Sequence, residues 1–416
     1  MMGFYSLAKM AWRNLWRHKR RTIITLSSIS LAVMLSVIGT GMNDRIWKDV
    51  VDMAARVGGG HVTIQHPEYA DKPTLTRTVT DTDKKAALAK KNENVDRVVS
   101  RIVGQTLLST AYDSFGAGFI AYDPTQEDTS TLSILEAVKE GRGFTSPGQR
   151  GILLGATLAR NLGAKLGRKV VYTMSNKNGE IVHGLARVTG IIKSGSPSVD
   201  LGLCLLPIGS VRKELGYAPD EATQVAVFLR DNRKSGAVAR QLIKSLKGED
   251  AVLNWQKTQP DLDSLIAMKK GGMVFFEMLI LTLCAAGIFN TVFVSVMERL
   301  REFGIMMAIG LAPWRLFGLV MLECFWLALV GLAVSVIMTL WPYHYLNTTG
   351  IDMSAIYGGE KVDIAGIGMD SILKVEIYPE NAFAIAVIVV IATLLSGVYP
   401  AWRAGRVNPV DAIKLV

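Results

Sequence analysis

Few residues of this sequence are spaced for catalysis or metal binding. The histidines His61, His66 and His183 lack the spacing of zinc ligands, and the three cysteines offer no disulfide framework. Neither G-x-S-x-G nor H-E-x-x-H occurs, and Gly163–Lys169 lacks the spacing of a phosphate-binding G-x-x-x-x-G-K-[ST] loop. We therefore expect no catalytic residue, no metal and no cofactor on this chain, so any ATP-driven action requires a second polypeptide.

A charged turn followed by an apolar stretch is the best candidate for a protein contact. It runs from Glu298 to Gly304 as Glu-Arg-Leu-Arg-Glu-Phe-Gly and continues through Ala308 to Gly310 and Pro313. This order predicts a short helix lying across a membrane face, whose apolar residues stay poorly covered unless a partner docks on them. No internal partner for its charges is evident in the sequence. The alternative is a plain amphipathic connector.

Two glutamates, Glu277 and Glu323, interrupt otherwise apolar runs, where an ionised carboxylate is costly. We expect a structural role for each. Glu323 would pair with a polar group such as Asn290 or with a partner chain, and Glu277, near the outer end of its run, would reach water. No series of groups that could relay a proton is visible.

Four apolar runs contain or flank the charged turn and the two glutamates, and must position them. Half of the 416 residues are hydrophobic, the mean hydropathy is +0.28 and 20% are charged, a balance typical of membrane spans joined to a sizeable water-exposed part. The runs at 22–42, 271–297, 316–341 and 382–402 reach the length of about 20 residues that a membrane helix needs. Buried core helices of this length normally show a polar stripe, and these runs do not.

The charges beside these runs predict the orientation of the chain. Basic residues exceed acidic ones before the first run, between the second and third, and after the fourth, whereas acidic residues prevail between the third and fourth. By the positive-inside rule, both termini and the second loop are cytoplasmic in a multi-pass inner-membrane protein. Because long domains translocate regardless of charge, the net charge of +10 does not indicate a nucleic-acid partner.

The segment before the first run is amphipathic. Apolar residues from Phe4 to Leu15 share one helical face, while Lys9, Arg13 and Arg17 recur every four residues on another. The pattern predicts a helix in the inner membrane interface, with its basic groups toward anionic lipid. Serving only as a topology anchor is the compatible alternative.

The long segment between the first two runs predicts a mixed α+β domain. Asn178-Gly179 between two apolar segments is a strong hairpin signal, and from Pro260 the pattern turns helical and runs into the second span. The predicted strands lie at 61–65, 95–112, 170–174, 181–192, 201–207, 224–229 and 251–255, and the predicted helices at 84–91, 158–166 and 235–246.

Four segments in the same order resemble the permeases of the FtsX-like class of ABC transporters. The string from Glu298 to Gly310 matches the E-R-x-R-E-[FI]-G-x-x-x-A-[IV]-G motif of that class, and Tyr399–Ile413 is similar to its closing P-A-x-R-A-x-R-x-x-P-x-x-A-[IL] signature. Ala11–Leu15 is similar to its opening A-x-R-N-L, and Gly151–Gly155 resembles part of its outer domain. The resemblance implies an α-helical membrane protein with four transmembrane helices and a large extracytoplasmic α+β domain.

The resemblance also implies partners and a mechanism. Such permeases pair with a second copy or a paralogue and with two cytoplasmic ATPase subunits, which carry the ATP and magnesium. The inner loop becomes a coupling helix seated on the ATPase, and stalk helices carry its movement to the outer domain. The implied coupling residues are Glu298, Arg299, Arg301, Glu302, Phe303, Gly304, Ala308 and Gly310.

The implied organisation follows these spans. It consists of a cytoplasmic amphipathic helix at 1–21, transmembrane helices at 22–42, 271–297, 316–341 and 382–402, a periplasmic α+β domain at 43–270, a coupling-helix loop at 298–315, a periplasmic loop at 342–381 and a cytoplasmic tail at 403–416.

Within this class the chain is most similar to the lipoprotein-releasing, Lol-type permeases. Span order, length, a large domain only after the first span, the absence of a fused ATPase, and Trp255 with Pro260 and Leu262 support this branch. It implies a lipoprotein substrate and a periplasmic carrier. The alternatives are a macrolide-efflux-type exporter permease, which usually carries a fused ATPase, and a division-type regulator of cell-wall hydrolases, whose outer domain is smaller. A free-standing membrane enzyme fits least.

A lipid-anchored substrate would have to enter from the outer leaflet. The outer halves of the first two spans carry apolar residues at helical spacing, and methionine and phenylalanine suit variable acyl chains. Packing against neighbouring helices or bulk lipid is the alternative for these faces. The candidate residues are Leu35, Ile38, Met42, Phe275, Met278 and Leu279.

Overall fold

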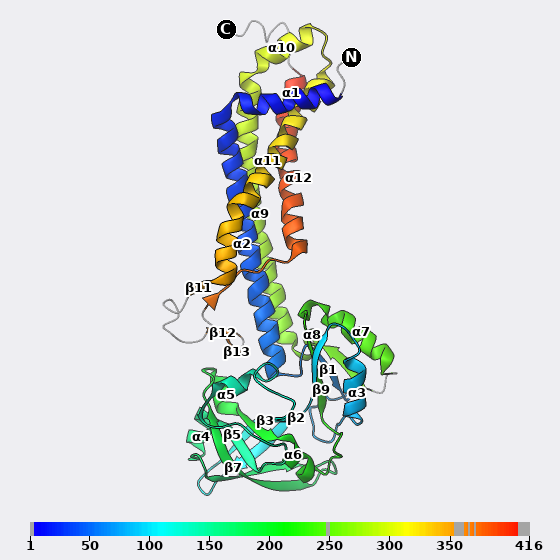
Figure 1. The fold of residues 1–416 in the computed structure, drawn as a ribbon, viewed down its shortest axis with the longest axis vertical. Helices are drawn as coiled ribbons and strands as arrows, with labels where there is room; N and C mark the ends of the chain where they lie inside the picture. Colours follow the sequence, from blue (N-terminus) through cyan, green and yellow to red (C-terminus); the bar gives the residue numbers. More distant parts are fainter. Residues whose placement is uncertain (1–3, 247–249, 353–361, 365–366, 370–371, 407–416) are drawn as a thin grey trace. The chain divides into compact units, whose positions relative to one another are not determined.

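The computed structural model describes residues 4–246, 250–352, 362–364, 367–369 and 372–406 (Figure 1). The chain separates into two compact units. The helical unit comprises Met1–Ile46, Ala267–Ile351 and Ile372–Val416, and the α+β unit comprises Trp47–Ile266 and Asp352–Ser371. The last residues of the closing motif, 407–413, and the rest of the predicted tail after Arg406 lie outside the described residues.

Four helices of the described chain are long and apolar enough to cross a membrane, and each contains one of the predicted runs. All four are longer than the predicted runs. The two longest extensions are rich in polar residues: one continues the helix past the run at 22–42, and the other precedes the run at 271–297. The helices with residues in the helical unit are α1 Phe4–Arg17, α2 Lys19–Val57, α9 Pro260–Glu298, α10 Leu300–Ala308, α11 Pro313–Thr348 and α12 Pro379–Gly405.

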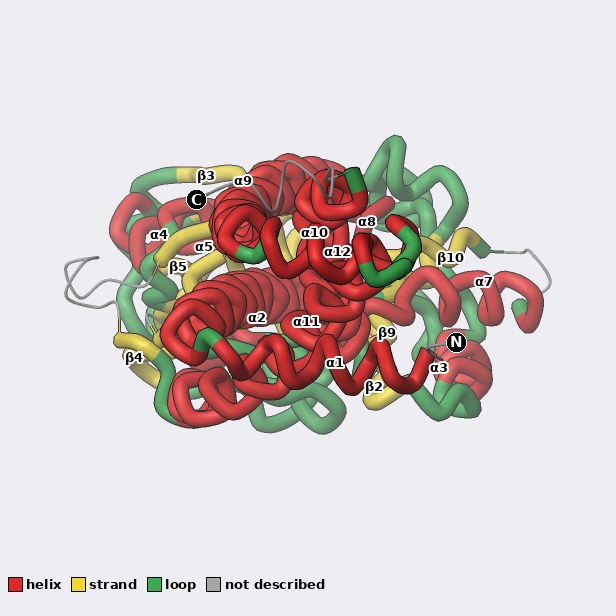
Figure 2. Tube along the Cα trace, turned by 90° about the horizontal axis from the view of Figure 1, so that it is seen from above, coloured by secondary structure: helices red, strands yellow, loops and turns green. Residues whose placement is uncertain are grey.

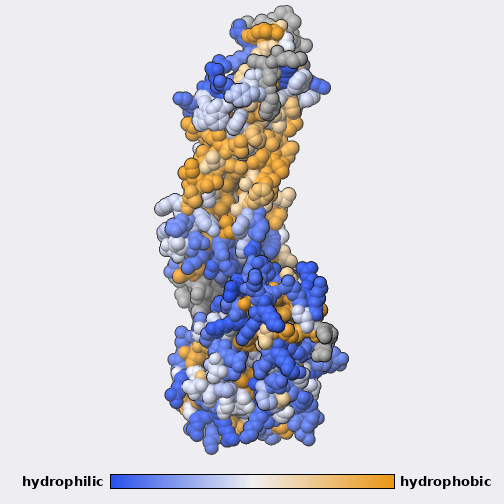
Figure 3. Space-filling view, turned by 45° about the vertical axis from the view of Figure 1, so that its right-hand side comes forward, coloured by the Kyte–Doolittle hydropathy of each residue, from blue (hydrophilic) through white to orange (hydrophobic). Residues whose placement is uncertain are grey.

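The surface of the helical unit carries a broad hydrophobic band, seen in orange in Figure 3. Exposed phenylalanine, isoleucine and leucine side chains on α9, α11 and α12 contribute to it, such as Phe275, Ile337 and Leu395. Soluble proteins rarely expose a continuous apolar surface of this kind. The band is the surface expected to face lipid.

Small residues let the long helices approach closely. A Cβ on Gly331 of α11 would lie 2.9 Å from the side chain of Ile29 on α2, and one on Gly397 of α12 would lie 2.4 Å from Cys324 Sγ on α11. Close helix contacts at small residues are the usual way in which helices associate inside a bilayer. A larger residue at Gly397 would therefore separate α12 from α11.

Helix α1 lies across one end of the long helices, as Figures 1 and 2 show. It buries Leu7, Ala11 and Leu15, which recur at every fourth position. The chain then bends at His18, where the Thr22 hydroxyl donates to the Leu15 carbonyl at 2.5 Å. The predicted amphipathic segment is thus a separate helix packed on the bundle.

At the far end of the same unit, the segment before α12 is held on α2. Asp44 accepts hydrogen bonds from the Tyr378 amide at 3.2 Å and from the Asn381 side chain at 2.7 Å. Arg45 forms an ion pair with Glu376 at 2.7 Å. These contacts fix the approach of α12 to the bundle.

The α+β unit is built on a ten-stranded mixed sheet of order β10-β1-β9-β2-β3-β8-β5-β7-β4, with β6 paired to β2 and β7. Most neighbours are antiparallel, but β3–β8 and β5–β7 are parallel. Its strands are β1 Val62–Gln65, β2 Val95–Ser109, β3 Ser114–Tyr122, β4 Val138–Gly141, β5 Gly151–Gly155, β6 Lys169–Ser175, β7 Ile181–Ile192, β8 Leu203–Pro207, β9 Gln224–Leu229 and β10 Ala251–Asn254. Four short strands lie outside this sheet and pair as β11 with β14 and β12 with β13: β11 Ile351–Asp352, β12 Val362–Ile364, β13 Ile367–Met369 and β14 Ile372–Leu373.

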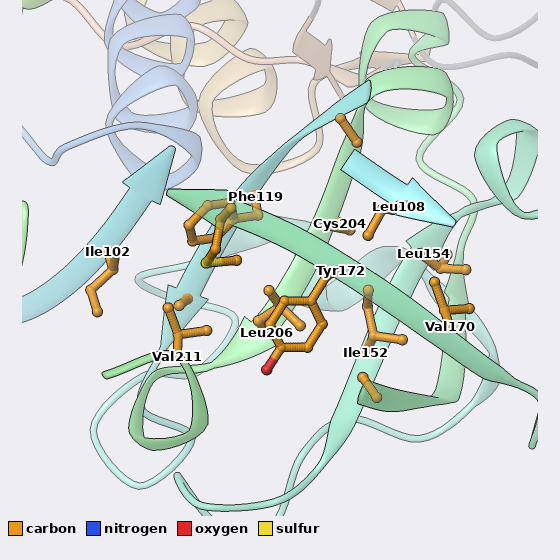
Figure 4. Close-up of a cluster of buried hydrophobic side chains, with 14 of the residues drawn as sticks. Ile102, Leu108, Phe119, Ile152, Leu154, Val170, Tyr172, Cys204, Leu206 and Val211 are labelled. Carbon is orange, nitrogen blue, oxygen red and sulfur yellow. The ribbon is translucent and has the colours of Figure 1, made fainter. Parts of the chain in front are cut away.

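Two of the hydrophobic cores that stabilise this sheet are large. Helices α3 and α7 contribute to one core with β1, β9 and β10, and β9 is buried at every position, as a strand covered on both faces must be. Figure 4 shows the other core, where Phe119, Ile152 and Tyr172 meet beside Cys204. The helices are α3 Thr82–Ala89, α4 Ala156–Asn161, α5 Pro197–Gly202, α6 Ile208–Leu215, α7 Ser235–Ser245 and α8 Trp255–Thr258, with 3-10 turns η1 Ser133–Ala137 and η2 Asn232–Lys234.

Several strands differ from the sequence prediction. The strand predicted at 95–112 ends at Ser109, because the Thr110 amide bonds to the Asp113 carbonyl and turns the chain into β3. Strand β3 was not predicted, since Gly116 and Gly118 weaken its strand signal. Strand β5 was also missed, and the strand predicted at 201–207 begins at Leu203, after the short helix α5. The strands predicted at 181–192 and 224–229 match β7 and β9.

Candidate functional site

The charged turn at the end of α9 directs its first arginine inward. Arg299 lies between α9 and α10, and its guanidinium Nη1 lies 3.0 Å from both carboxylate oxygens of Glu323 on α11. The side chains of Arg299 and Glu323 are only 8% and 14% exposed. The Arg299 guanidinium also lies over the Phe303 ring, 5.0 Å from its centroid. The charged turn is therefore anchored in the helical unit by a buried ion pair.

Helix α1 reaches the same carboxylate. The side-chain amide of Asn14 donates to Glu323 Oε1 at 2.8 Å, and Trp12 of α1 packs edge-on against Trp326 of α11 with ring centroids 5.2 Å apart. We call the set Asn14, Arg299 and Glu323 the joint. It ties α1, the charged turn and α11 together through one carboxylate.

The partners of Glu323 are Asn14 and Arg299. From the sequence, Asn290 or another chain was expected instead. Arg299 was assigned to the turn as a surface charge, and the sequence offered no reason to point it inward. Asn14 entered the sequence analysis only as part of the A-x-R-N-L resemblance, and its contact was not predicted, although it lies seven residues after Leu7 and three after Ala11, beside the buried positions of α1. A polar amide beside such positions is the signal that could have identified it.

Exposed ion pairs surround the joint. Arg17 lies 2.8 Å from Glu302, and Arg21 lies 2.6 Å from Glu298. The expectation that this turn lacks internal partners was therefore wrong, because α1 and the start of α2 supply them. Exposed pairs of this kind contribute about 0–1 kcal/mol each, so the buried joint carries more of the binding between these elements.

A small polar cavity of about 50 Å³ adjoins the joint. That volume is enough to hold water, which occupies cavities above about 10–15 Å³ when polar groups line them. The Arg21 Nη1 atom is buried here without a protein hydrogen-bond partner among the described residues. The lining includes Asn14, His18, Thr22, Thr25, Thr291, Ser295, Arg299 and Glu323.

Beyond the joint, α10 and the start of α11 present an uncovered apolar surface. Ile309 is 82% exposed and Trp314 is 68% exposed, with the Arg315 guanidinium 5.2 Å from the Trp314 ring centroid. Arg301 and Ile305 are exposed on the same short segment. We call these residues, Arg301, Ile305, Ile309 and Trp314, the docking face.

The predicted coupling residues thus fall into two groups. Arg299, Phe303 and Gly304 are buried in the helical unit, and Glu302 is half-buried. Glu298, Arg301, Ala308 and Gly310 are exposed. The buried group holds the short helix in place, and the exposed group is available to a partner.

The six residues proposed for acyl chains lie on α2 and α9. Leu35, Phe275, Met278 and Leu279 are exposed, whereas Ile38 and Met42 are half-buried. Glu277 is half-buried beside them on α9. The four exposed side chains provide apolar surface, and their role stays a prediction.

A second buried arginine–glutamate pair lies in the α+β unit. Arg101 of β2 donates from Nε to both oxygens of Glu127, at 3.1 and 3.0 Å, and both side chains are 0% exposed. Its other nitrogens donate to the carbonyls of Gly58 and Thr131, and its guanidinium lies 5.5 Å from the Phe228 ring centroid. We call this set the Arg101 clamp, since it binds the residue that follows α2 to the sheet.

Two family models match the chain. A MacB-like periplasmic core domain matches residues 22–245, more than half of the chain, and an FtsX-like permease C-terminal domain matches residues 274–409. Together with the four apolar helices and the α+β unit, these matches define a membrane permease with a large periplasmic domain. The chain belongs to the ABC transporter permeases of the FtsX, MacB and LolC type.

Relatives with assigned names are similar at low identity. The lipoprotein-releasing system transmembrane protein LolC of Xylella fastidiosa is 25% identical over 70% of this chain and 71% of its own length. The ABC transporter permease YknZ of Bacillus subtilis is 23% identical over 99% of this chain and 100% of its own. The α+β unit is also similar to the solved extracellular domain of YknZ, with a TM-score of 0.33 and 18% identity over 46% of this chain and 98% of that one.

These findings confirm the family and the fold class predicted from the sequence. They support a non-catalytic membrane subunit that acts with an ATPase partner, as ABC permeases do. The substrate, the orientation of the termini and the roles of individual residues are not assigned by the family.

Proposed function

We propose that this permease receives a cytoplasmic ABC ATPase on its docking face and uses ATP hydrolysis to release lipoproteins from the outer leaflet of the inner membrane. In this arrangement both termini and α10 are cytoplasmic, a second copy or a paralogue completes the permease, and a periplasmic carrier accepts the lipoprotein. Relatives named as lipoprotein-releasing proteins support the substrate.

The main support for a contact with the ATPase is a contrast between two sides of the same segment. One side is exposed and apolar, and the other is bonded into the helical unit. An uncovered apolar surface on a nine-residue helix is costly in water and is typical of a partner site. The same turn is fixed from behind by the buried joint. A rigidly held surface that lacks its own cover is what a separate subunit needs in order to push on the bundle.

Charge reversal at the docking face tests this role. The variant Arg301→Glu should insert and fold, because this side chain is exposed and belongs to the docking face, yet lose co-purification with the ATPase and stimulation of its activity. The matched control exchanges the exposed pair Arg97 and Asp128 of the α+β unit. Wild-type co-purification and stimulation in the first variant would refute the coupling role.

Entry of acyl chains is proposed at the outer halves of α2 and α9. The bilayer holds an acyl chain by about 0.8 kcal/mol for each CH₂ group kept from water, so a site that extracts it must offer comparable apolar contact. The residues proposed for this contact are Leu35, Ile38, Met42, Phe275, Met278 and Leu279. A photo-crosslinker at Met278 should capture a lipoprotein in the absence of ATP and lose it after ATP addition. The control position is Phe383, an exposed residue of α12; equal capture at both positions would contradict the site.

Reconstitution tests the substrate. The permease and its ATPase in proteoliposomes, loaded with a triacylated lipoprotein, should release it to a soluble carrier only with hydrolysable ATP. The match to a MacB-like periplasmic domain favours macrolide export as the second candidate. ATP-dependent macrolide transport without lipoprotein release would overturn the first assignment in favour of the second.

A further inference from the structure

The joint connects α10, the helix that would face the ATPase, to α1. The family comparison gives α1 no role. Helix α1 is held at Glu323 by Asn14 and at Trp326 by Trp12. It also reaches the charged turn through the exposed pair of Arg17 and Glu302. Any displacement of the charged turn that keeps the buried ion pair intact must therefore move Glu323, and Asn14 with it.

We propose that Asn14 and Glu323 are positioning residues of the coupling step, which make α1, the charged turn and α11 move as one body when the ATPase acts on α10. The proposal rests on the proposed function in one respect only, that α10 is the helix on which the ATPase acts. In this account α1 is a moving part of the transmission in addition to its place at the membrane surface.

The chemistry of the joint suits a connection that must hold under displacement. Arg299 and Glu323 are buried among the apolar residues of the helical core, including Leu15, Phe303 and Leu327. Separating them would leave a buried charge without its partner, which is unfavourable even beside a small cavity. The charges are therefore expected to stay together while the helices that bear them shift.

The cavity gives the joint room to shift. Thr22, Thr25, Ser295 and Arg21 line the same cavity as Glu323, and Arg21 Nη1 has no hydrogen-bond partner in the part of the chain that the structure describes. These groups can hydrogen-bond the carboxylate in a second arrangement, directly or through water. Two arrangements of a packed polar network are the kind of two-state element that coupling between distant sites requires.

The alternative role for these residues is purely structural. A structural joint would affect folding, membrane insertion and ATPase binding together, and would leave the movements of α1 and α10 independent of each other. A positioning joint leaves assembly intact and links the two movements. The two roles are separated by measuring the distance between α1 and α10 during the ATP cycle.

The test uses the full permease–ATPase complex in lipid nanodiscs, with spin labels on unnatural amino acids at Lys9 of α1 and at Ile309, which directly follows α10; both residues are exposed. In the wild-type joint the Lys9–Ile309 distance should stay constant between the nucleotide-free and ATP-bound states. In Asn14→Ala, which keeps the Arg299–Glu323 ion pair and removes the hydrogen bond from α1 to Glu323, the Lys9–Ile309 distance should change with ATP. Substrate-coupled ATPase activity should fall by at least about fivefold, the lower end of usual coupling effects.

Controls separate this proposal from the proposed function. Glu277→Gln, at the other glutamate within a span, should leave both the distance and the coupling at wild-type values. Charge exchange, Arg299→Glu with Glu323→Arg, should restore part of the coupling lost in Glu323→Gln. An Asn14→Ala complex that assembles, keeps a constant distance and couples normally would overturn the positioning role. A wild-type permease that binds no ATPase would instead refute the proposed function.

Discussion

Two buried arginine–glutamate pairs occur among the residues that the structure describes, and they are built differently. In the Arg101 clamp both side chains are fully buried, and every guanidinium nitrogen donates to a carboxylate or a backbone carbonyl. In the joint, Arg299 and Glu323 retain 8% and 14% exposure, and a cavity of about 50 Å³ lies beside them. One pair is bonded into a sheet, whereas the other is shared among three helical segments.

The two pairs therefore differ in how freely they can rearrange. A fully satisfied buried arginine rigidifies its surroundings, because each alternative position leaves several groups unbonded. A pair with an adjoining polar cavity has alternative partners and can rearrange at lower cost. We infer that the Arg101 clamp fixes Gly58 to the sheet, and that the joint holds α1, the charged turn and α11 together while the adjoining cavity leaves this body room to shift.

The largest effect is expected in the Arg101 clamp. Glu127→Gln should lower the free energy of unfolding by about 3–5 kcal/mol, the usual cost of leaving a buried charge without its partner. The measurement is thermal and denaturant unfolding of the full-length protein in detergent. Arg97→Ala, which removes an exposed ion pair with Asp128, is the control and should cost about 0–1 kcal/mol. Similar losses in the two variants would remove the basis of the comparison.

The same substitution in the joint should cost less stability. In Glu323→Gln the side-chain oxygen still accepts from Asn14, and water in the cavity can solvate Arg299, so we expect a loss of about 1–3 kcal/mol. Unfolding under the same conditions as for Glu127→Gln measures the difference directly. A loss in Glu323→Gln that equals or exceeds the loss in Glu127→Gln would mean that the joint is as fixed as the clamp.

The smallest effect is a dependence on pH at the edge of the α+β unit. The Ser130 hydroxyl and the Arg97 guanidinium outweigh the opposing effect of burial and hold the pKa of Asp128 at about 2, below its ordinary value of 3.8. Because the folded-state pKa is lowered, the carboxylate stabilises the fold above about pH 4 and loses this contribution as the pH falls toward 2. Solvent exposure keeps the contribution small.

Comparing the melting temperatures of wild type and Asp128→Asn at several pH values measures this contribution. The two curves should differ slightly at pH 6 and converge near pH 2. A difference that grows on acidification would show that the sign of the effect is wrong.

The sequence predicted those features that depend on local pattern. The four spans follow from apolar runs, and the β6–β7 hairpin follows from Asn178-Gly179. Strand β3 escaped prediction because glycines at 116 and 118 hide its alternation. Contacts between distant residues escaped as well, since Asn14 and Glu323 are 309 positions apart.

Polar residues at otherwise apolar positions were the sequence signals that could have indicated these distant contacts. Asn14 lies beside the buried apolar positions of α1, and Arg101 interrupts the apolar run of β2 between Val99 and Ile102. Such a residue needs a partner, and the pattern says that one exists. It does not say which one, because the partner is set by how the elements pack.

Hydrogen exchange tests the central contrast between the joint and the clamp most directly. The unmodified permease with its ATPase is compared in the nucleotide-free and ATP-bound states, with exchange followed by mass spectrometry. We predict that peptides covering residues 11–22 and 296–304 change their exchange rates on ATP binding, while peptides covering 97–104 keep theirs. Unchanged exchange around Asn14 and Arg299, or an equal change around Arg101, would contradict the account.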